Sequence, residues 1–125
     1  MELHKGEWIM INKKLCHIDE ECVDWVLLFN KIGLTTKFCC HGNDEVLDYY
    51  EIVFHEDVTD NQIYEFMQKH PKIWGFYKWT RTGYCNDTLY HNWVFSPKTK
   101  RCAKELFEQL CQYEDIKLII ENKLR

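Results

Sequence analysis

Thiol and imidazole side chains concentrate in one stretch of the sequence, Cys39-Cys40-His41-Gly42. A second pair lies further along the chain, with five residues between Cys85 and His91. Zinc prefers four nitrogen or sulfur ligands, often supplied as close pairs from two turns or strand ends. Alternate residues of a strand point to the same side, so Cys39 and His41 suit one such pair. The candidate zinc ligands are Cys39, His41, Cys85 and His91.

The same residues also fit a thiol enzyme. Cys40 lies beside a glycine turn and next to His41, and a nucleophilic cysteine needs a histidine within reach. The candidate catalytic residues are therefore Cys40 and His41. A structural explanation stands beside both hypotheses, because cysteine often acts as a small buried hydrophobe and the chain has no C-x-x-C pair. We expect no cofactor, with zinc as the alternative.

Four cations gather at the expected start of the last helix, after Ser96-Pro97. Acidic residues follow later in the helix, which reverses the order that the helix dipole favours. Cations beside bare N–H groups predict an anion pocket for phosphate or an acidic partner. The alternative is a solvated helix face. The candidate residues are Lys98, Lys100, Arg101 and Lys104.

Aromatic residues fill two expected strands between residues 74 and 95. An exposed aromatic strand face is typical of base stacking or of a protein interface. On the ferredoxin-like sheet of an RNA recognition motif, the third strand carries basic and aromatic residues. Here the acidic Glu51 occupies that strand, so a protein partner is the favoured hypothesis. The candidate binding residues are Trp74, Tyr77, Trp79 and Trp93.

Composition narrows the class of protein. The 125 residues have a formal net charge of −4, with 46% hydrophobic and 29% charged residues, which is ordinary for one soluble domain. A general nucleic-acid binder usually has a basic balance. We find no secretory signal and no apolar run of about 20 residues. We therefore expect a single domain, residues 1–125, in the cytoplasm and without membrane contact.

The apolar pattern predicts the elements that carry these side chains. Spacings of three and four residues predict a helix from Asp19, its N-cap, to Gly33. A capping box at Thr59-Asp60-Asn61-Gln62 starts a second helix, which stops at His70-Pro71. A third helix has Ser96 as its N-cap and Pro97 at its first position. Strands are expected at 7–12, 35–41, 49–55, 73–82 and 89–95, and 116–120 is either strand or helix.

This order of elements predicts an α+β fold. The first six elements follow the ferredoxin-like βαββαβ order, which gives a mostly antiparallel sheet with helices on one face. One further strand and a C-terminal helix extend it.

The stretch Phe29-Asn30-Lys31-Ile32-Gly33, followed by 36–42, resembles a pattern in small uncharacterised proteins of bacteriophages and Gram-positive bacteria. Those chains read Leu-Asn-x-x-Gly, then Thr-x-x-Ser-Cys-x-Gly-His, then an aromatic strand like 50–54 here. This sequence has Cys39 in place of the serine and Asn43 in place of the histidine. The resemblance implies a phage or prophage context in the host cytoplasm, and no particular chemistry.

We therefore expect a phage-encoded binding protein that inhibits or modulates a host protein or defence system through an aromatic and basic surface. The alternatives are a metal- or thiol-dependent enzyme centred on the Cys and His residues, and a protein that sequesters nucleotides or other anions. The sequence leaves the oligomeric state open.

Overall fold

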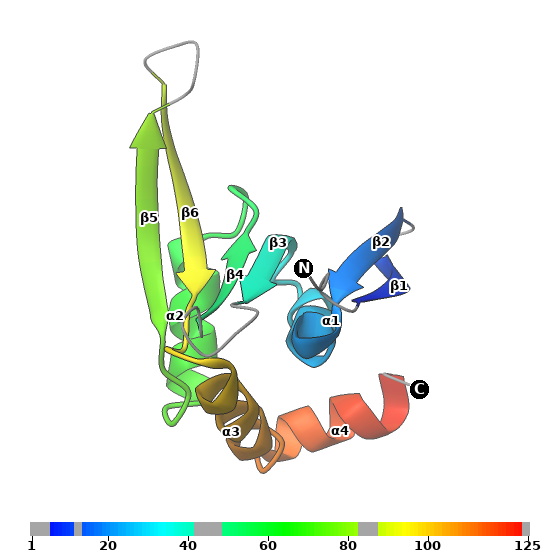
Figure 1. The fold of residues 1–125 in the computed structure, drawn as a ribbon. Helices are drawn as coiled ribbons and strands as arrows, with labels where there is room; N and C mark the ends of the chain where they lie inside the picture. Colours follow the sequence, from blue (N-terminus) through cyan, green and yellow to red (C-terminus); the bar gives the residue numbers. More distant parts are fainter. Residues whose placement is uncertain (1–5, 12–13, 42–48, 83–87, 124–125) are drawn as a thin grey trace.

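The computed structural model describes residues 6–11, 14–41, 49–82 and 88–123. Within these residues the chain forms two antiparallel sheets and a set of helices around them (Figure 1). The elements in chain order are β1 (Gly6–Ile11), β2 (Lys14–Asp19), the 3₁₀ turn η1 (Glu20–Cys22), α1 (Val23–Lys31), β3 (Thr36–His41), β4 (Tyr50–Phe54), α2 (Asp60–Lys69), β5 (Phe76–Thr82), β6 (Leu89–Phe95), α3 (Lys100–Leu110) and α4 (Glu114–Lys123).

The larger sheet has four strands in the order β3-β4-β6-β5, and every neighbouring pair is antiparallel. One face of this sheet is aromatic, because Phe95 pairs with Phe76 and stands two positions from Trp93 along β6. Phe29 of α1 packs its ring against Phe54, Phe76 and Phe95, at centroid distances of 5.0, 6.3 and 5.4 Å. The main core therefore lies between this face and the helices.

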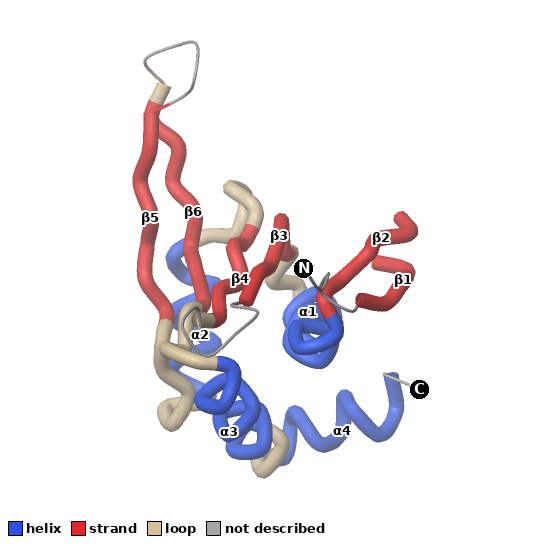
Figure 2. The backbone as a smooth tube through the Cα atoms, viewed as in Figure 1, coloured by secondary structure: helices blue, strands red, loops and turns tan. Residues whose placement is uncertain are grey.

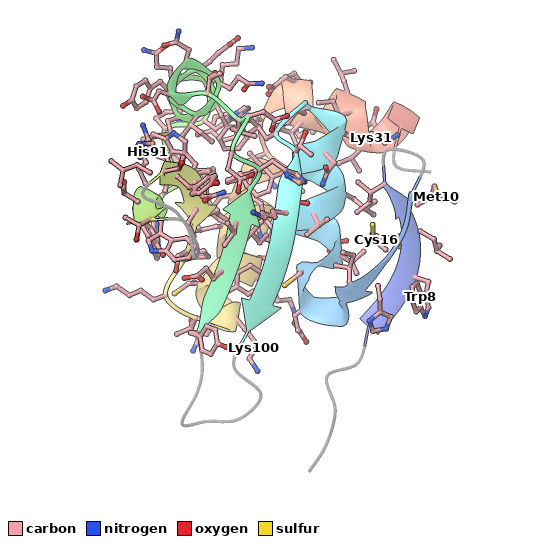
Figure 3. The ribbon with its side chains drawn as sticks, turned by 90° about the horizontal axis from the view of Figure 1, so that it is seen from above. Trp8, Met10, Cys16, Lys31, His91 and Lys100 are labelled. Atoms are coloured by element: carbon pink, nitrogen blue, oxygen red, sulfur yellow. The ribbon has the colours of Figure 1, made fainter. Side chains whose placement is uncertain are left out.

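The smaller sheet is the β1–β2 hairpin, with a continuous register from Gly6–Asp19 to Ile11–Lys14. Helix α1 lies between this hairpin and β3 (Figures 2 and 3). Its sequence, VDWVLLFNK, buries five of nine residues: Val23, Trp25, Val26, Leu28 and Phe29. Burial of this many residues requires neighbours on several sides. Here both sheets supply them, and so does α3, whose Ala103 carbonyl accepts from Trp25 Nε1 at 3.0 Å.

The predicted α+β class and the mostly antiparallel sheet are confirmed. The strand pairing differs from the ferredoxin-like arrangement, because β1 pairs with β2 in a sheet of its own and does not join the larger sheet. The predicted start of the first helix is wrong. Asp19 is the last residue of β2, and the N-cap position is Cys22, which makes no side-chain cap hydrogen bond. Pairing with β1 along six residues outweighs the local capping signal.

The other helix ends divide between confirmed and corrected predictions. Gly33 ends α1 with φ +90°, as predicted. The predicted capping box of α2 forms in full, because the Gln62 backbone N–H and the Thr59 hydroxyl make one bond and the Gln62 side chain accepts from the Thr59 N–H.

The predicted cap of α3 is wrong. Its N-cap is Thr99, whose hydroxyl accepts from the Cys102 N–H at 3.1 Å. Ser96 instead donates from its hydroxyl to the Tyr50 carbonyl at 3.0 Å. Residues 116–120 are helical and belong to α4, which settles the alternative that the sequence left open.

Candidate functional site

The β5–β6 hairpin reaches well beyond the rest of the larger sheet (Figure 1). β4 pairs with β6 only at Ile52–Phe95 and Val53–Val94, whereas β5 and β6 stay paired out to Thr82–Leu89. The outer part of the hairpin, residues 77–82 with 89–93, is therefore a two-stranded ribbon, which we call the aromatic ribbon. A two-stranded hairpin has little stability of its own, so its base must be held.

Asp60, the first residue of α2, holds the base of the aromatic ribbon. Its Oδ1 accepts from Lys78 Nζ at 2.9 Å and from Trp93 Nε1 at 2.8 Å. These hydrogen bonds, the Lys78 bond first, lower the pKa of the Asp60 carboxyl. The ionised carboxylate at the helix N-terminus also suits the helix dipole. One residue thus joins α2 to both strands of the hairpin.

Tyr77 and Trp79 share the face of the ribbon that points away from Asp60, because they stand two residues apart on β5 and opposite Val94 and Asn92. Their exposed fractions are 43% and 42%, and Leu89 on the opposite face is 59% exposed. The Tyr77 hydroxyl donates to Glu51 Oε2 at 3.1 Å. These two predicted binding residues therefore lie together on an accessible sheet face.

Asn92 is paired with Trp79 across the two strands and is only 1% exposed. Its side-chain amide donates to the Phe54 carbonyl at 2.8 Å, which joins β6 to β4 just beyond their last paired residues. Among the described residues its Oδ1 has no hydrogen-bond partner. The Asn92 side chain therefore extends the connection between β4 and β6 and supports the part of the sheet that carries Tyr77 and Trp79.

The other two predicted binding tryptophans lie elsewhere. Trp93 is 8% exposed, and its ring meets Tyr64 edge-on at 5.7 Å, so it belongs to the packing between β6 and α2. Trp74 is 45% exposed and precedes Gly75, whose carbonyl accepts from the Ser96 N–H at 2.7 Å. Only Trp74, of these two, can meet a partner.

Carboxylates lie close to the predicted cations of α3. Arg101 Nε donates to Glu105 Oε1 at 3.1 Å, on a side chain that is 87% exposed. Lys98 lies before the helix and is exposed. A groove of about 280 Å³ between α1 and α3 has both signs of charge in its lining: Lys100, Lys104 and Glu108 from α3, and Glu21 and Asp24 from the opposite wall. Nearby acids and the Thr99 cap reduce the attraction for an anion that the sequence predicts at this helix start.

The predicted metal and thiol sites fall mostly outside the part of the chain that the structure describes. Cys85 lies in a segment outside it, and so do the side chains of Cys39, Cys40 and His41. Among the predicted ligands, His91 is described. It is exposed on β6, and its Nδ1 is 3.0 Å from the Thr80 hydroxyl on β5. Within the described residues, no three His, Cys, Asp or Glu side chains are arranged to hold a metal ion.

A second hollow, which the sequence did not indicate, lies between α1, α2 and α4. Its volume is about 390 Å³, and its lining is half apolar (Ile32, Leu34, Phe66, Ile116 and Ile119) and half polar or charged (Gln62, Glu65, Lys69, His70 and Asp115). His70 lies in its wall, 2% exposed, with Nδ1 2.9 Å from the Phe66 carbonyl and Nε2 2.9 Å from Asp115 Oδ2. Both nitrogens are engaged, so this imidazole has no free position for acid–base catalysis.

None of the described helices is both long and apolar enough to cross a lipid bilayer. A comparison with protein families matches residues 7–125 to a model described as "YoqC prophage protein". Searches of curated proteins and of solved structures give no match. Because the family model spans almost the whole sequence, the chain belongs to the YoqC prophage protein family.

Proposed function

We propose that this prophage protein works by binding a host protein through the aromatic ribbon and that it inhibits or modulates that protein. The observation that carries the proposal is the exposure of Tyr77 and Trp79 on one face of a ribbon that projects past its sheet. Tyrosine and tryptophan are enriched at the centres of protein interfaces. A prophage protein acts inside a bacterial host, so a host protein is the natural target.

The ribbon suits this role because its base is held and its outer part is accessible. Lys78 and Trp93 join it to Asp60, while Tyr77 is positioned by Glu51. A ring held as Tyr77 is held loses little conformational entropy when a partner covers it. We assign the contact to the ribbon and not to the start of α3, where carboxylates share the groove with Lys100 and Lys104.

A tagged chain expressed in the bacterial host tests the proposal by quantitative mass spectrometry of co-purified proteins. The test variant is the double substitution Tyr77→Ser, Trp79→Ser. The matched control is Met67→Ser, Leu118→Ser, which removes two exposed apolar side chains (37% and 56%) from α2 and α4. Both pairs lie on the surface, so circular dichroism should show native folding for each.

The expected result is one host protein that co-purifies with the native chain and the control and falls at least about tenfold with the ribbon variant, as loss of interface hot spots requires. A host protein retained equally by the ribbon variant contradicts the proposal, and so does the absence of any specific host protein.

A further inference from the structure

The β1–β2 hairpin carries a second exposed apolar face. Trp8 pairs with His17 and Met10 pairs with Leu15 in the register, so these four residues share one side of the two-stranded sheet. We call them the outer hairpin face. Trp8, Met10 and Leu15 are 66%, 63% and 61% exposed, more than any other large apolar side chain in the described part of the chain. Figure 3 shows Trp8 and Met10 pointing away from the body of the protein.

The inward side of the same hairpin explains why the outer face stays exposed. Ile11 and Ile18 alternate with the outer residues along their strands and pack against the core beside α1. Because side chains alternate across a strand, burying these isoleucines turns Trp8, Met10 and Leu15 outward. A register slip that covered the outer residues would expose the isoleucines.

The outer hairpin face has a fixed shape. The ring of His17 leans on Trp8, with centroids 4.9 Å apart. Gly6 leaves space for that ring, since a Cβ at this position would collide with His17 and would lie 2.8 Å from the Ile18 carbonyl. The absence of a side chain at Gly6 thus holds the imidazole and the indole together.

A small groove continues the face beside α1. Its volume is about 100 Å³, and it is lined by Met10, Ile11, Leu27, Asn30 and Lys31. The Lys31 side chain is exposed and is part of the groove lining. This end of the face therefore combines an apolar slot with positive charge.

The exposed area, the groove and the charge of Lys31 indicate which kind of partner the outer hairpin face can bind. The three apolar side chains expose on the order of 400 Å², about half of what each partner buries in a standard interface. A second copy would bury too little area on this face alone for a stable dimer. A flat lipid surface would cover the side chains but leave the groove unused. A short protein segment fits both the area and the slot.

We propose that the outer hairpin face binds a short protein segment that presents apolar side chains next to carboxylates, with one apolar side chain in the groove by Met10 and a carboxylate on Lys31. The aromatic ribbon and this face lie at opposite ends of the molecule (Figure 1). The chain can therefore hold two partners at once, and this second contact does not depend on the first.

Nuclear magnetic resonance titration of the ¹⁵N-labelled full chain tests this proposal with three synthetic nine-residue peptides. The first alternates Asp or Glu with Leu or Phe, the second has Lys in place of each acid, and the third has Ser in place of each apolar residue. The expected result is that only the first peptide shifts the amide signals of β1, β2 and the end of α1.

Substitutions test whether the peptide binds at the outer hairpin face and at Lys31. Binding of the acidic apolar peptide should weaken at least about tenfold in Trp8→Ser, Met10→Ser, and Lys31→Glu should reverse the preference toward the basic peptide. The control Tyr77→Ser, Trp79→Ser should bind the acidic apolar peptide as the native chain does. The proposal for the outer hairpin face can therefore fail or succeed independently of the proposal for the aromatic ribbon.

Several results would overturn the proposal. These are no hairpin shifts with any peptide, equal shifts with the acidic and basic peptides, and hairpin shifts that grow with protein concentration alone, which indicate a second copy. Hairpin shifts with phosphatidylglycerol vesicles but not with the acidic peptide would indicate a lipid surface instead.

Discussion

At the residue scale, His70 is a buried polar side chain, 2% exposed, with a contact at each ring nitrogen. Its two ring nitrogens lie 2.9 Å from the Phe66 carbonyl and from Asp115 Oδ2, and both partners are acceptors. Tyr113 meets the ring edge-on at 4.9 Å. The residue therefore ties the end of α2 to the start of α4.

Replacing this imidazole should be costly. His70→Ala removes a buried ring and two hydrogen bonds, and we expect the free energy of unfolding to fall by about 2–4 kcal/mol. Urea unfolding measures it. Asp115→Asn keeps the ring in place and should cost about 1 kcal/mol or less, because that carboxylate is half exposed. Equal losses for the two variants would contradict this assignment.

Glu56 gives the protein an acid-sensitive contact. A hydrogen bond from Lys37, with further help from its own backbone N–H, lowers the pKa of Glu56 from 4.5 to about 2. A carboxyl whose pKa is lower in the folded state stabilises the fold above its unfolded value. This stabilisation is therefore present above about pH 4.5 and is lost as the pH falls toward 2.

Glu56→Gln should flatten the acid limb of the stability curve. The native chain should lose up to about 1 kcal/mol more than the variant between pH 4.5 and pH 2, a small value because the pair is about one-third exposed. Melting temperatures across this range measure it, with the neighbouring Asp57→Asn as control. Parallel curves for the native chain and Glu56→Gln would show that the contact is absent.

Residue type alone predicted part of the candidate site. Tyr77 and Trp79 are as exposed as a binding role requires, whereas Trp93 is buried although it is the same kind of residue in the same block. The difference lies in the sheet face, since Trp93 faces Asp60 and Tyr64 of α2. Which face a helix will cover depends on contacts distant in sequence, and strand alternation does not contain that information.

Two glycines show at the scale of elements how turns hold the sheet and helices in place. Gly33 ends α1 with φ +90°, and a Cβ there would meet nothing within 4 Å. Gly75 precedes β5 with φ +109°, and a Cβ there would lie 3.0 Å from the Pro97 backbone nitrogen. Both glycines therefore have a positive φ, but Gly33 lies at an open helix end and Gly75 lies where two backbone segments pass close together.

Alanine substitutions at Gly33 and Gly75 should separate the cost of a positive φ from the cost of a steric clash at Cβ. Gly33→Ala should cost about 1–2 kcal/mol, the penalty for a left-handed L-residue. Gly75→Ala should cost at least about 1 kcal/mol more, because backbone and not a flexible side chain blocks the Cβ. Chemical unfolding of both variants measures the difference. An equal or smaller loss for Gly75→Ala would mean that the segments move apart freely.

Elements specified by neighbouring residues were predictable, and those specified by distant pairing were not. The capping box of α2 uses residues three apart and forms as predicted. β1 matches the strand predicted at 7–12, but β2 was missed, because the apolar spacing that continues into α1 already includes Ile18, and pairing with β1 makes 14–19 a strand. The outer hairpin face was missed with it, although Trp8, Met10 and Leu15 in alternation were a usable signal.

At the scale of the whole molecule, α1 lies between the two sheets, and the β5–β6 and β1–β2 hairpins lie at opposite ends (Figure 1). Each hairpin carries exposed apolar side chains: Tyr77 and Trp79 on the first, and Trp8, Met10 and Leu15 on the second. The helices bury the ring cluster around Phe29, so the core is built from one face of the larger sheet. The aromatic ribbon and the outer hairpin face remain outside that core. This shape suits a protein that works by contact with other proteins.

Site-specific photo-crosslinking in the bacterial host tests the central claim most directly. A benzophenone amino acid replaces Trp79 on the ribbon or, as control, Met67 on α2, and both variants are irradiated in cells. We predict one host-protein adduct from position 79, with a site of attachment that mass spectrometry identifies, and no adduct to that protein from position 67. The same adduct from position 67, or none from position 79, would contradict binding through the aromatic ribbon.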